Sequence, residues 1–476
     1  MTGGAVDLVI HGGTVVNATG RVAASVAIEG GKIAAIGPRE TMPEARETID
    51  ARGRYVLPGA IDAHVHFREP GLEYKEDWGT GTAAAAAGGV TTVFEMPNTD
   101  PPTDAVETFA LKERAAAAQA VVDYGIYGLL GEDNLDQLKP LAAAGAIGFK
   151  LFLGNTTGNL PCPSDGAVLE GFEILAGLGL RCTVHAENSP ILFRREARMK
   201  AAGRKDVLAH LAARPDVCAL EALNRTAIFA EWTGARVHIA HESTRRSLPF
   251  IRDAKARGVD LTVETCPQYF LLSTDDMLKP GGAVLRVNPP IREPGQQEPL
   301  FEALLDGTID MLSTDHAPHL PSEKDRASIW DCSCGFPGVE TSMRLMLDRV
   351  NGNRLTLEEY VRMACTAPAR AFGLYPRKGV LAPGSDADIA IVDLAREETI
   401  LAEKLHSRSK VTPYHGRRVR GVPVMTLVRG RVVMKDGEVV GPAGWGRRQR
   451  PAMAPGQVRN PNTTMDAIVV PGNRPY

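Results

Sequence analysis

The chain has 476 residues, 44% of them hydrophobic and 23% charged, which suits one large core with a smaller appended domain and excludes a disordered polypeptide. The formal net charge is −3 with acidic and basic residues intermixed, so we expect no nucleic-acid partner and no membrane partner. The first residues lack the pattern of a signal peptide and no apolar run has the length of a bilayer span, so we expect a cytoplasmic protein.

Short segments of alternating apolar and polar residues open the chain. Within 1–57, runs such as DLVIHGG and SVAIEGG are separated by glycines, a pattern typical of β-hairpins. The same pattern returns over 376–440, where Asp436 and Gly437 form a type I′ turn signal. We therefore predict a small β-sandwich domain formed by both ends of the chain, from 1–57 and 376–440.

Between these ends, residues 58–375 alternate short β-rich runs with longer helical stretches, which indicates repeated βα units around a parallel sheet. This length fits a closed (β/α)8 TIM barrel of the α/β class. The predicted strands are 61–67, 90–96, 121–128, 147–152, 181–186, 236–240, 260–265 and 311–314. Residues 441–476 are rich in Pro, Gly, Asn and Arg, and we predict an extended C-terminal arm there.

The first barrel strand ends in a pair of candidate metal ligands. His64 and His66 are two residues apart, so in an extended strand both side chains project from the same face. A single histidine in an apolar strand is more often a core residue with a satisfied hydrogen bond. Two at this spacing favour a shared cation.

Other predicted strands also end in ionisable residues, and barrel enzymes place their chemistry at this edge. Lys150 stands in an apolar run, where its ordinary interpretation is a buried stem with a head that reaches solvent or an acidic partner. His185 and His241 follow two further strands, and Asp315 ends the last. Imidazole and carboxylate groups suit zinc and similar divalent ions, and Asp315 could also take a proton. The set therefore favours metal-dependent hydrolysis of an amide.

These residues lie in an ordered series of motifs that resembles the amidohydrolase superfamily, and within it the cyclic amidohydrolases, which include dihydroorotase, allantoinase and hydantoinase. The motifs span nearly the whole chain: LPGAID, HVHFREPG, AAAAGGVTTVFEMPNT, GFKLFLGN, VHAEN, HIAHEST, ETCPQYFLL, RVNPPIRE, STDHAPH and GSDADIAIVDL. The resemblance implies a small-molecule substrate and an assembly of identical subunits, either a dimer or a tetramer.

The resemblance also implies that Lys150 is N-carboxylated and, together with a hydroxide, bridges two zinc ions. The implied metal ligands are His64, His66, Lys150, His185, His241 and Asp315. His238 fits less well than His241, because the matching motif places its ligand two residues before the serine. We interpret His238 as structural.

In this arrangement one ion is held by His64, His66 and Asp315, and the other by His185 and His241. Asp315 is also the implied catalytic residue, which carries the proton from the hydroxide to the amide nitrogen.

Four residues bear on the substrate. Arg68, two residues after His66, matches the position that binds the substrate carboxylate in dihydroorotases, where a guanidinium suits a planar anion. Asn98, Asn288 and His319 resemble further substrate contacts, although a rim charge, turn asparagines and a loop cap are the ordinary interpretations. Together they favour a dihydroorotase of pyrimidine biosynthesis, which interconverts N-carbamoyl-L-aspartate and dihydroorotate.

Two alternatives stay open. The loops after Lys150 and His319 match poorly, so the enzyme could instead be an allantoinase, a hydantoinase or dihydropyrimidinase, or another cyclic imide hydrolase. A non-catalytic relative that keeps the fold as a scaffold would be expected to lose metal ligands, and all of the candidate ligands are present in this chain.

Overall fold

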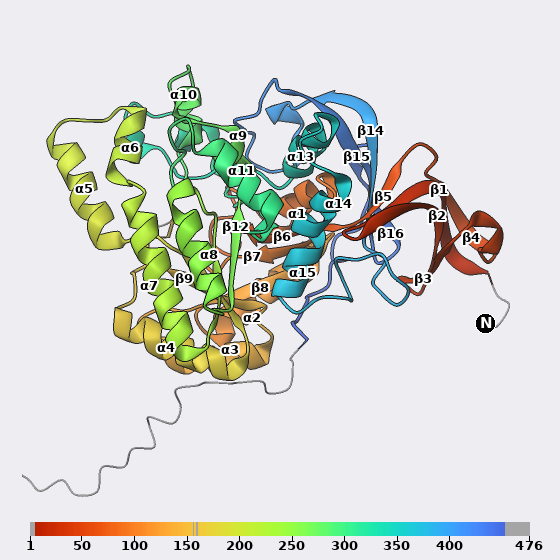
Figure 1. The fold of residues 1–476 in the computed structure, drawn as a ribbon, viewed down its shortest axis with the longest axis horizontal. Helices are drawn as coiled ribbons and strands as arrows, with labels where there is room; N and C mark the ends of the chain where they lie inside the picture. The colour runs from red at the N-terminus through yellow and green to blue at the C-terminus, as the bar shows by residue number, and fades with distance from the viewer. Residues whose placement is uncertain (1–4, 156, 159, 453–476) are drawn as a thin grey trace, which may run out of the picture.

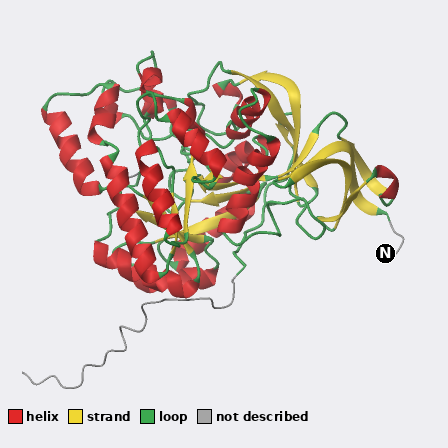
Figure 2. Ribbon diagram, viewed as in Figure 1, coloured by secondary structure: helices red, strands yellow, loops and turns green. Residues whose placement is uncertain are grey.

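The structure is a computed structural model that describes residues 5–155, 157–158 and 160–452. Its larger part is a barrel of strands surrounded by helices, and its smaller part is a β-rich unit at one side (Figures 1 and 2). No helix of the described residues is long and apolar enough to cross a membrane. All seven cysteines lie in the described residues, and none of them forms a disulfide.

Eight parallel strands form the barrel, and they pair in chain order. They are β6 (Ala60–Val65), β7 (Val90–Glu95), β8 (Asp123–Leu129), β9 (Gly148–Phe152), β10 (Arg181–His185), β11 (Arg236–Ile239), β12 (Leu261–Thr265) and β13 (Met311–Leu312). The ring closes where Val65 pairs with His316 and the His66 N–H donates to the His316 carbonyl oxygen at 2.7 Å. The predicted TIM barrel is confirmed.

Helices follow the strands and lie outside them (Figure 2). They are α1 (Trp78–Ala87), α2 (Val106–Gln119), α3 (Leu138–Ala144), α4 (Asp165–Leu178), α5 (Ser189–Ala201), α6 (Val207–Ala213), α7 (Val217–Thr233), α8 (Leu248–Ala256), α9 (Pro267–Leu271), α10 (Thr274–Met277), α11 (Gln297–Asp306), α12 (Pro321–Lys324), α13 (Ser342–Asn351), α14 (Leu357–Val361) and α15 (Ala367–Ala371). Parallel strands need such crossover connections, which explains the long helical stretches of the sequence.

The smaller unit contains a second, largely antiparallel sheet that joins both ends of the chain. Its strands are β1 (Val6–Asn17), β2 (Gly20–Glu29), β3 (Lys32–Gly37), β4 (Ala45–Asp50), β5 (Tyr55–Pro58), β14 (Ile389–Thr399), β15 (Arg418–Val428), β16 (Arg431–Lys435) and β17 (Glu438–Val439). The two ends meet where β14 pairs antiparallel with β5. The predicted β-sandwich from both termini is confirmed, and the domain limits given above stay a prediction.

Two local predictions can be compared with the structure. Asp436 and Gly437 both have positive φ, 51° and 91°, and join β16 to β17 in a two-residue hairpin, as the type I′ signal predicts. The predicted strand 311–314 was too long, because β13 ends at Leu312. Beyond it Thr314 bonds Asp62, whose carboxylate accepts from the Thr314 N–H at 3.2 Å and from its hydroxyl at 2.5 Å.

The described part of the predicted C-terminal arm packs against the amino-terminal end of the barrel. Gly446 donates to the Ala120 carbonyl oxygen at 2.7 Å, and Tyr124 at the start of β8 exchanges backbone hydrogen bonds with Arg447 and Gln449. The remainder of the predicted arm, 453–476, lies outside the described residues.

Asp123 joins this C-terminal segment to both parts of the molecule. Its carboxylate, fully buried, accepts from Lys378 Nζ at 2.7 Å, from Gln449 Nε2 and the Arg447 N–H at 2.9 Å each, and from Arg429. Asp123→Ala is expected to lower the free energy of unfolding by about 3 kcal/mol, because Arg429 loses its carboxylate partner and Lys378 keeps only those of Asp386 and Asp388. Denaturant unfolding followed by circular dichroism measures this loss.

The matched control for this prediction is Asp253→Ala, which removes an exposed carboxylate that pairs with Arg257. It should change the free energy of unfolding by less than about 0.5 kcal/mol. Equal unfolding curves for the two variants would contradict the role given to Asp123.

Candidate metal centre and substrate pocket

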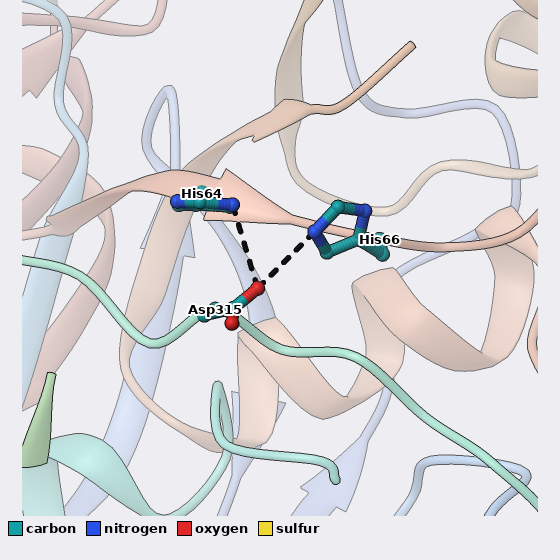
Figure 3. A group of neighbouring side chains, drawn as sticks. All are labelled: His64, His66 and Asp315. Atoms are coloured by element: carbon teal, nitrogen blue, oxygen red, sulfur yellow. Dashed lines mark hydrogen bonds and ion pairs between the residues drawn. The ribbon is translucent and has the colours of Figure 1, made fainter. Parts of the chain in front are cut away.

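Three candidate metal ligands converge at the carboxyl end of the barrel (Figure 3). Asp315 Oδ1 lies 3.1 Å from His66 Nε2 and 3.4 Å from His64 Nε2. The donor atoms of these residues all lie within 4.8 Å of one another. His64 is on β6, His66 follows that strand, and Asp315 follows β13, so the barrel closure itself brings them together.

The other ring nitrogen of each histidine is fixed by a side chain behind it. His64 Nδ1 lies 2.6 Å from Glu264 Oε1, and His66 Nδ1 lies 2.8 Å from Asn98 Oδ1. Since these oxygens accept, Nδ1 carries the proton and the Nε2 lone pair faces Asp315. Burial lowers the pKa of His64 to about 4, which keeps the ring in the neutral form that binds metal.

Lys150 on β9 is fully buried, and its Nζ has no hydrogen-bond partner among the described residues. It lies 5.1 Å from the centre of the Phe152 ring. The ordinary interpretation, a head that reaches solvent or an acidic partner, is therefore wrong. Burial lowers the pKa of Lys150 to about 8, which makes the neutral amine, the form that reacts with carbon dioxide, accessible near neutral pH.

His185 and His241 complete the group. Their ring centres are 4.6 Å apart, and the His241 ring is 5.1 Å from that of His64. His185 Nε2 lies 2.9 Å from Glu187 Oε2, and Glu187 is in turn bonded by Arg214. This contact leaves His185 Nδ1 as its free ligand atom.

One pocket at the barrel mouth is lined by all six predicted metal ligands. The other residues that line it are Arg68, Asn98, Phe152, Thr157, Asn288, Ala317 and Cys334. Arg68, His241 and Asp315 have φ values of 66°, 38° and 50°, a region that residues other than glycine seldom adopt. Such conformations concentrate at functional sites, where the surrounding contacts hold them.

Arg68 points its charge into this pocket without a full set of partners. The residue is 1% exposed, and its Nε and Nη1 have no hydrogen-bond partner among the described residues. Its Nη2 lies 3.3 Å from His319 Nε2. His319 is not one of the described residues that line the pocket, because it lies between Arg68 and Lys75, whose Nζ is 3.1 Å from His319 Nδ1.

The two predicted asparagines both reach the pocket but are held differently. Asn98 Oδ1 accepts a hydrogen bond from His66 Nδ1, and Asn98 Nδ2 donates to the Thr157 carbonyl oxygen at 3.1 Å. Asn288 has a buried Oδ1 without a partner among the described residues. Asn288 therefore has an acceptor free for a ligand, whereas the contacts of Asn98 hold a candidate metal ligand.

Sequence reasoning missed two buried carboxylates, Glu264 and Glu187. Glu264 on β12 contacts His64, and Glu187 contacts His185. Both lie inside the motifs ETCPQYFLL and VHAEN, where a carboxylate at a strand end was a visible signal. His238, interpreted as structural, lies away from the pocket, with Nδ1 2.9 Å from Thr262 Oγ1 and Nε2 3.1 Å from Glu264 Oε2.

The donor set fits a pair of divalent ions. It offers neutral imidazoles, one carboxylate and a buried amine that lacks any partner among the described residues. Borderline ions such as zinc prefer these ligands. An amine that becomes a carbamate would add a second carboxylate to this donor set.

The chain is similar to known proteins over most of its length. The profile of the Amidohydrolase family matches residues 55–433. The allantoinase of Rubrobacter xylanophilus is 40% identical over 92% of this chain and 97% of its own length. The L-hydantoinase of Paenarthrobacter aurescens is 36% identical over 93% of this chain and 97% of its own length.

Solved structures of similar fold carry the names of the same kinds of enzyme. The L-hydantoinase (dihydropyrimidinase) from Arthrobacter aurescens superposes with a TM-score of 0.91 at 36% identity, covering 93% of this chain and 99% of that chain. The dihydropyrimidinase from Brevibacillus agri NCHU1002 superposes with a TM-score of 0.88 at 32% identity, covering 94% and 99%.

Proposed function

The chain belongs to the amidohydrolase family and is a hydrolase of cyclic amides, and from this premise we propose that it opens uncharged cyclic ureides of the allantoin and hydantoin type. The observation that carries the hydrolytic part is the convergence of six candidate metal ligands on one pocket. The choice of ring rests on the relatives named above. Dihydroorotate, predicted as the leading substrate, is not supported by those relatives, and neither is a place in pyrimidine biosynthesis.

We propose zinc as the metal, bound as two ions with a carboxylated Lys150 between them. His64, His66 and Asp315 would hold one ion, and His185 and His241 the other. The bound ions would supply an activated water and polarise the scissile carbonyl.

Asp315 would accept the proton of the attacking water and deliver it to the departing ring nitrogen. Its carboxylate lies next to the Nε2 atoms of His64 and His66, at the edge of the pocket where that water would stand. Burial raises the pKa of Asp315, which makes it a better proton acceptor than an exposed aspartate.

Two polar groups would orient the ring. Asn288 Oδ1 can accept from a ring N–H, and Nε and Nη1 of Arg68 can donate to a ring carbonyl oxygen, since none of these atoms has a partner within 5–155, 157–158 and 160–452. A ureide presents both kinds of group side by side. His319, which is not among the residues lining the pocket, would act only indirectly, since its ring lies beside Arg68 and contacts Lys75 through Nδ1 and the Cys334 carbonyl oxygen through Nε2.

A second candidate substrate is a ring that carries a carboxylate, such as dihydroorotate. One observation favours it: the buried Arg68 guanidinium lines the pocket and has no carboxylate partner in the part of the chain that the structure describes. A bidentate contact with a substrate carboxylate would satisfy it.

A substrate panel tests the proposal. The zinc-loaded protein would be given allantoin, hydantoin, dihydrouracil and dihydroorotate at equal concentration, and the rate of ring opening recorded. The proposal expects the highest kcat/KM with an uncharged ring. Preference for dihydroorotate would instead establish the second candidate.

Arg68→Gln separates the two candidates further. For an uncharged ring, the variant loses one hydrogen bond to a carbonyl, and kcat/KM should fall about tenfold. For a carboxylate-bearing ring, it loses a charge-assisted pair, and the fall should exceed about a hundredfold. Arg326→Gln, an exposed arginine beyond α12, serves as the control and should leave both rates unchanged. A fall above a hundredfold for the uncharged rings would contradict the role proposed for Arg68.

The assembly and the cellular compartment stay predictions. Light scattering of the purified protein would distinguish a monomer from the predicted dimer or tetramer.

A further inference from the structure

Glu264 contacts two of the candidate metal ligands, whereas Asn98 and Glu187 contact one each. Its Oε1 lies 2.6 Å from His64 Nδ1 and accepts from the His241 N–H at 3.2 Å. Its Oε2 lies 3.1 Å from His238 Nε2. The side chain is fully buried, so these contacts replace water around a charge that would otherwise be costly to bury.

The contact with His241 is to the backbone, at a place where the backbone is unusual. His241 follows β11 and has a φ of 38°, which a residue with a β-carbon seldom adopts without support. Glu264 supplies that support twice, because its side chain accepts from the His241 N–H and its carbonyl oxygen accepts from the Glu242 N–H at 2.8 Å. The turn that aims the His241 ring therefore depends on β12.

The other supporting groups each act on one ligand. Of the candidate metal ligands, Asn98 contacts the ring of His66 and Glu187 contacts the ring of His185. His64 and His241 belong to different halves of the proposed centre. Glu264, unlike Asn98 and Glu187, contacts a ligand of each half.

We propose that Glu264 is a positioning residue that couples the two metal sites: it fixes the ring of His64 for one ion and the backbone turn of His241 for the other. This inference rests on the proposed function, because it assumes that both histidines bind metal. A carboxylate on Nδ1 also raises the basicity of the opposite nitrogen and so strengthens the bond to metal.

His238 has a part in this arrangement. It lies on β11 and is held by Thr262 at 2.9 Å, so its Nε2 reaches the second carboxylate oxygen of Glu264 from a fixed direction. The carboxylate is therefore held through Oε1 by His64 and the His241 N–H, while the His238 ring lies beside Oε2 without a hydrogen bond to it. This explains why a histidine outside the pocket is fully buried there.

Glu264→Gln tests the proposal, since glutamine keeps the size of the side chain and removes its charge. Zinc affinity at each site would be measured by competition with a chromophoric chelator, and the cobalt-substituted protein would be examined by absorption spectroscopy. We expect both affinities to fall about tenfold or more, and the cobalt bands of both sites to shift. Glu187→Gln is the matched control, and it should weaken the His185 site and leave the other at wild-type affinity.

The outcomes separate this inference from the proposed function. A wild-type protein that binds no zinc would contradict the metal centre itself. A wild-type protein with two tight sites and an unchanged Glu264→Gln would overturn the coupling and leave the function standing, as would a variant weakened at one site only.

Glu264→Gln could fail to fold, which its thermal melt would reveal. His238→Asn then takes its place, because it removes the ring that lies 3.1 Å from Glu264 Oε2 without touching a proposed ligand. We expect it to weaken both sites by a smaller factor, and unchanged affinities would overturn the proposal.

Discussion

Lys150→Ala is expected to lose the zinc ions and to lower the rate of ring opening on the order of 10⁴-fold. The side chain is fully buried with an Nζ that has no partner among the described residues, so it has no evident structural task that alanine would disturb. Its proposed task is to carry a carboxylate that would help to hold the two ions. Metal analysis of the purified variant, together with its rate, measures the effect.

Lys150→Arg is the matched control, because arginine keeps a cation on β9 and cannot be carboxylated in the same way. We expect it to be as inactive as the alanine variant. A short-chain carboxylic acid with added zinc should partly restore Lys150→Ala, since the acid can occupy the space that the side chain leaves, and should not restore Lys150→Arg. A Lys150→Ala variant that keeps both ions and a near-normal rate would contradict the bridging role.

Asp315→Asn is expected to retain part of its metal and to lose about 10³-fold in kcat, because asparagine cannot take up the proton. The change is nearly isosteric, and an amide oxygen can still face His64 and His66. Steady-state kinetics on the best ring of the panel, normalised to bound zinc, separates lost turnover from lost metal.

Asp325→Asn, an exposed aspartate just beyond α12, is the control for this measurement and should keep the wild-type rate. If Asp315→Asn, corrected for its metal content, turned over at the wild-type rate, the proton would have to travel by another group.

The barrel could be predicted from the sequence because parallel strands and crossover helices leave different periodicities in the chain. Strand ends were less predictable. Thr314, for example, has the β-branched side chain typical of a strand but bonds the buried Asp62 instead. The C-terminal segment has little periodicity, because Gly446 and Gln449 pack on the barrel through backbone hydrogen bonds that leave no side-chain pattern.

The residues of the candidate site could be predicted from the sequence only in part. The spacing of His64 and His66 signals a shared face, because strand geometry fixes it locally. Glu264 could not be linked to His64 in the same way, since 200 residues separate them and only barrel closure brings them to 2.6 Å. His319 follows the last barrel strand and was predicted to contact the substrate. In the fold its ring lies next to Arg68 and does not line the pocket.

Substrate choice was the least predictable part. Arg68 pointed to a carboxylate-bearing ring, whereas the relatives are named for allantoin and hydantoin chemistry. A guanidinium can donate to a carbonyl as well as to a carboxylate, so its presence does not decide the ring.

The most direct test of the central claim is a zinc titration of the metal-stripped protein, with the rate of allantoin or hydantoin opening recorded at each addition. The account predicts no turnover without metal and a rate that rises to a plateau at two zinc ions per chain. Full activity in the stripped protein, or a loaded protein that opens no cyclic amide, would contradict it.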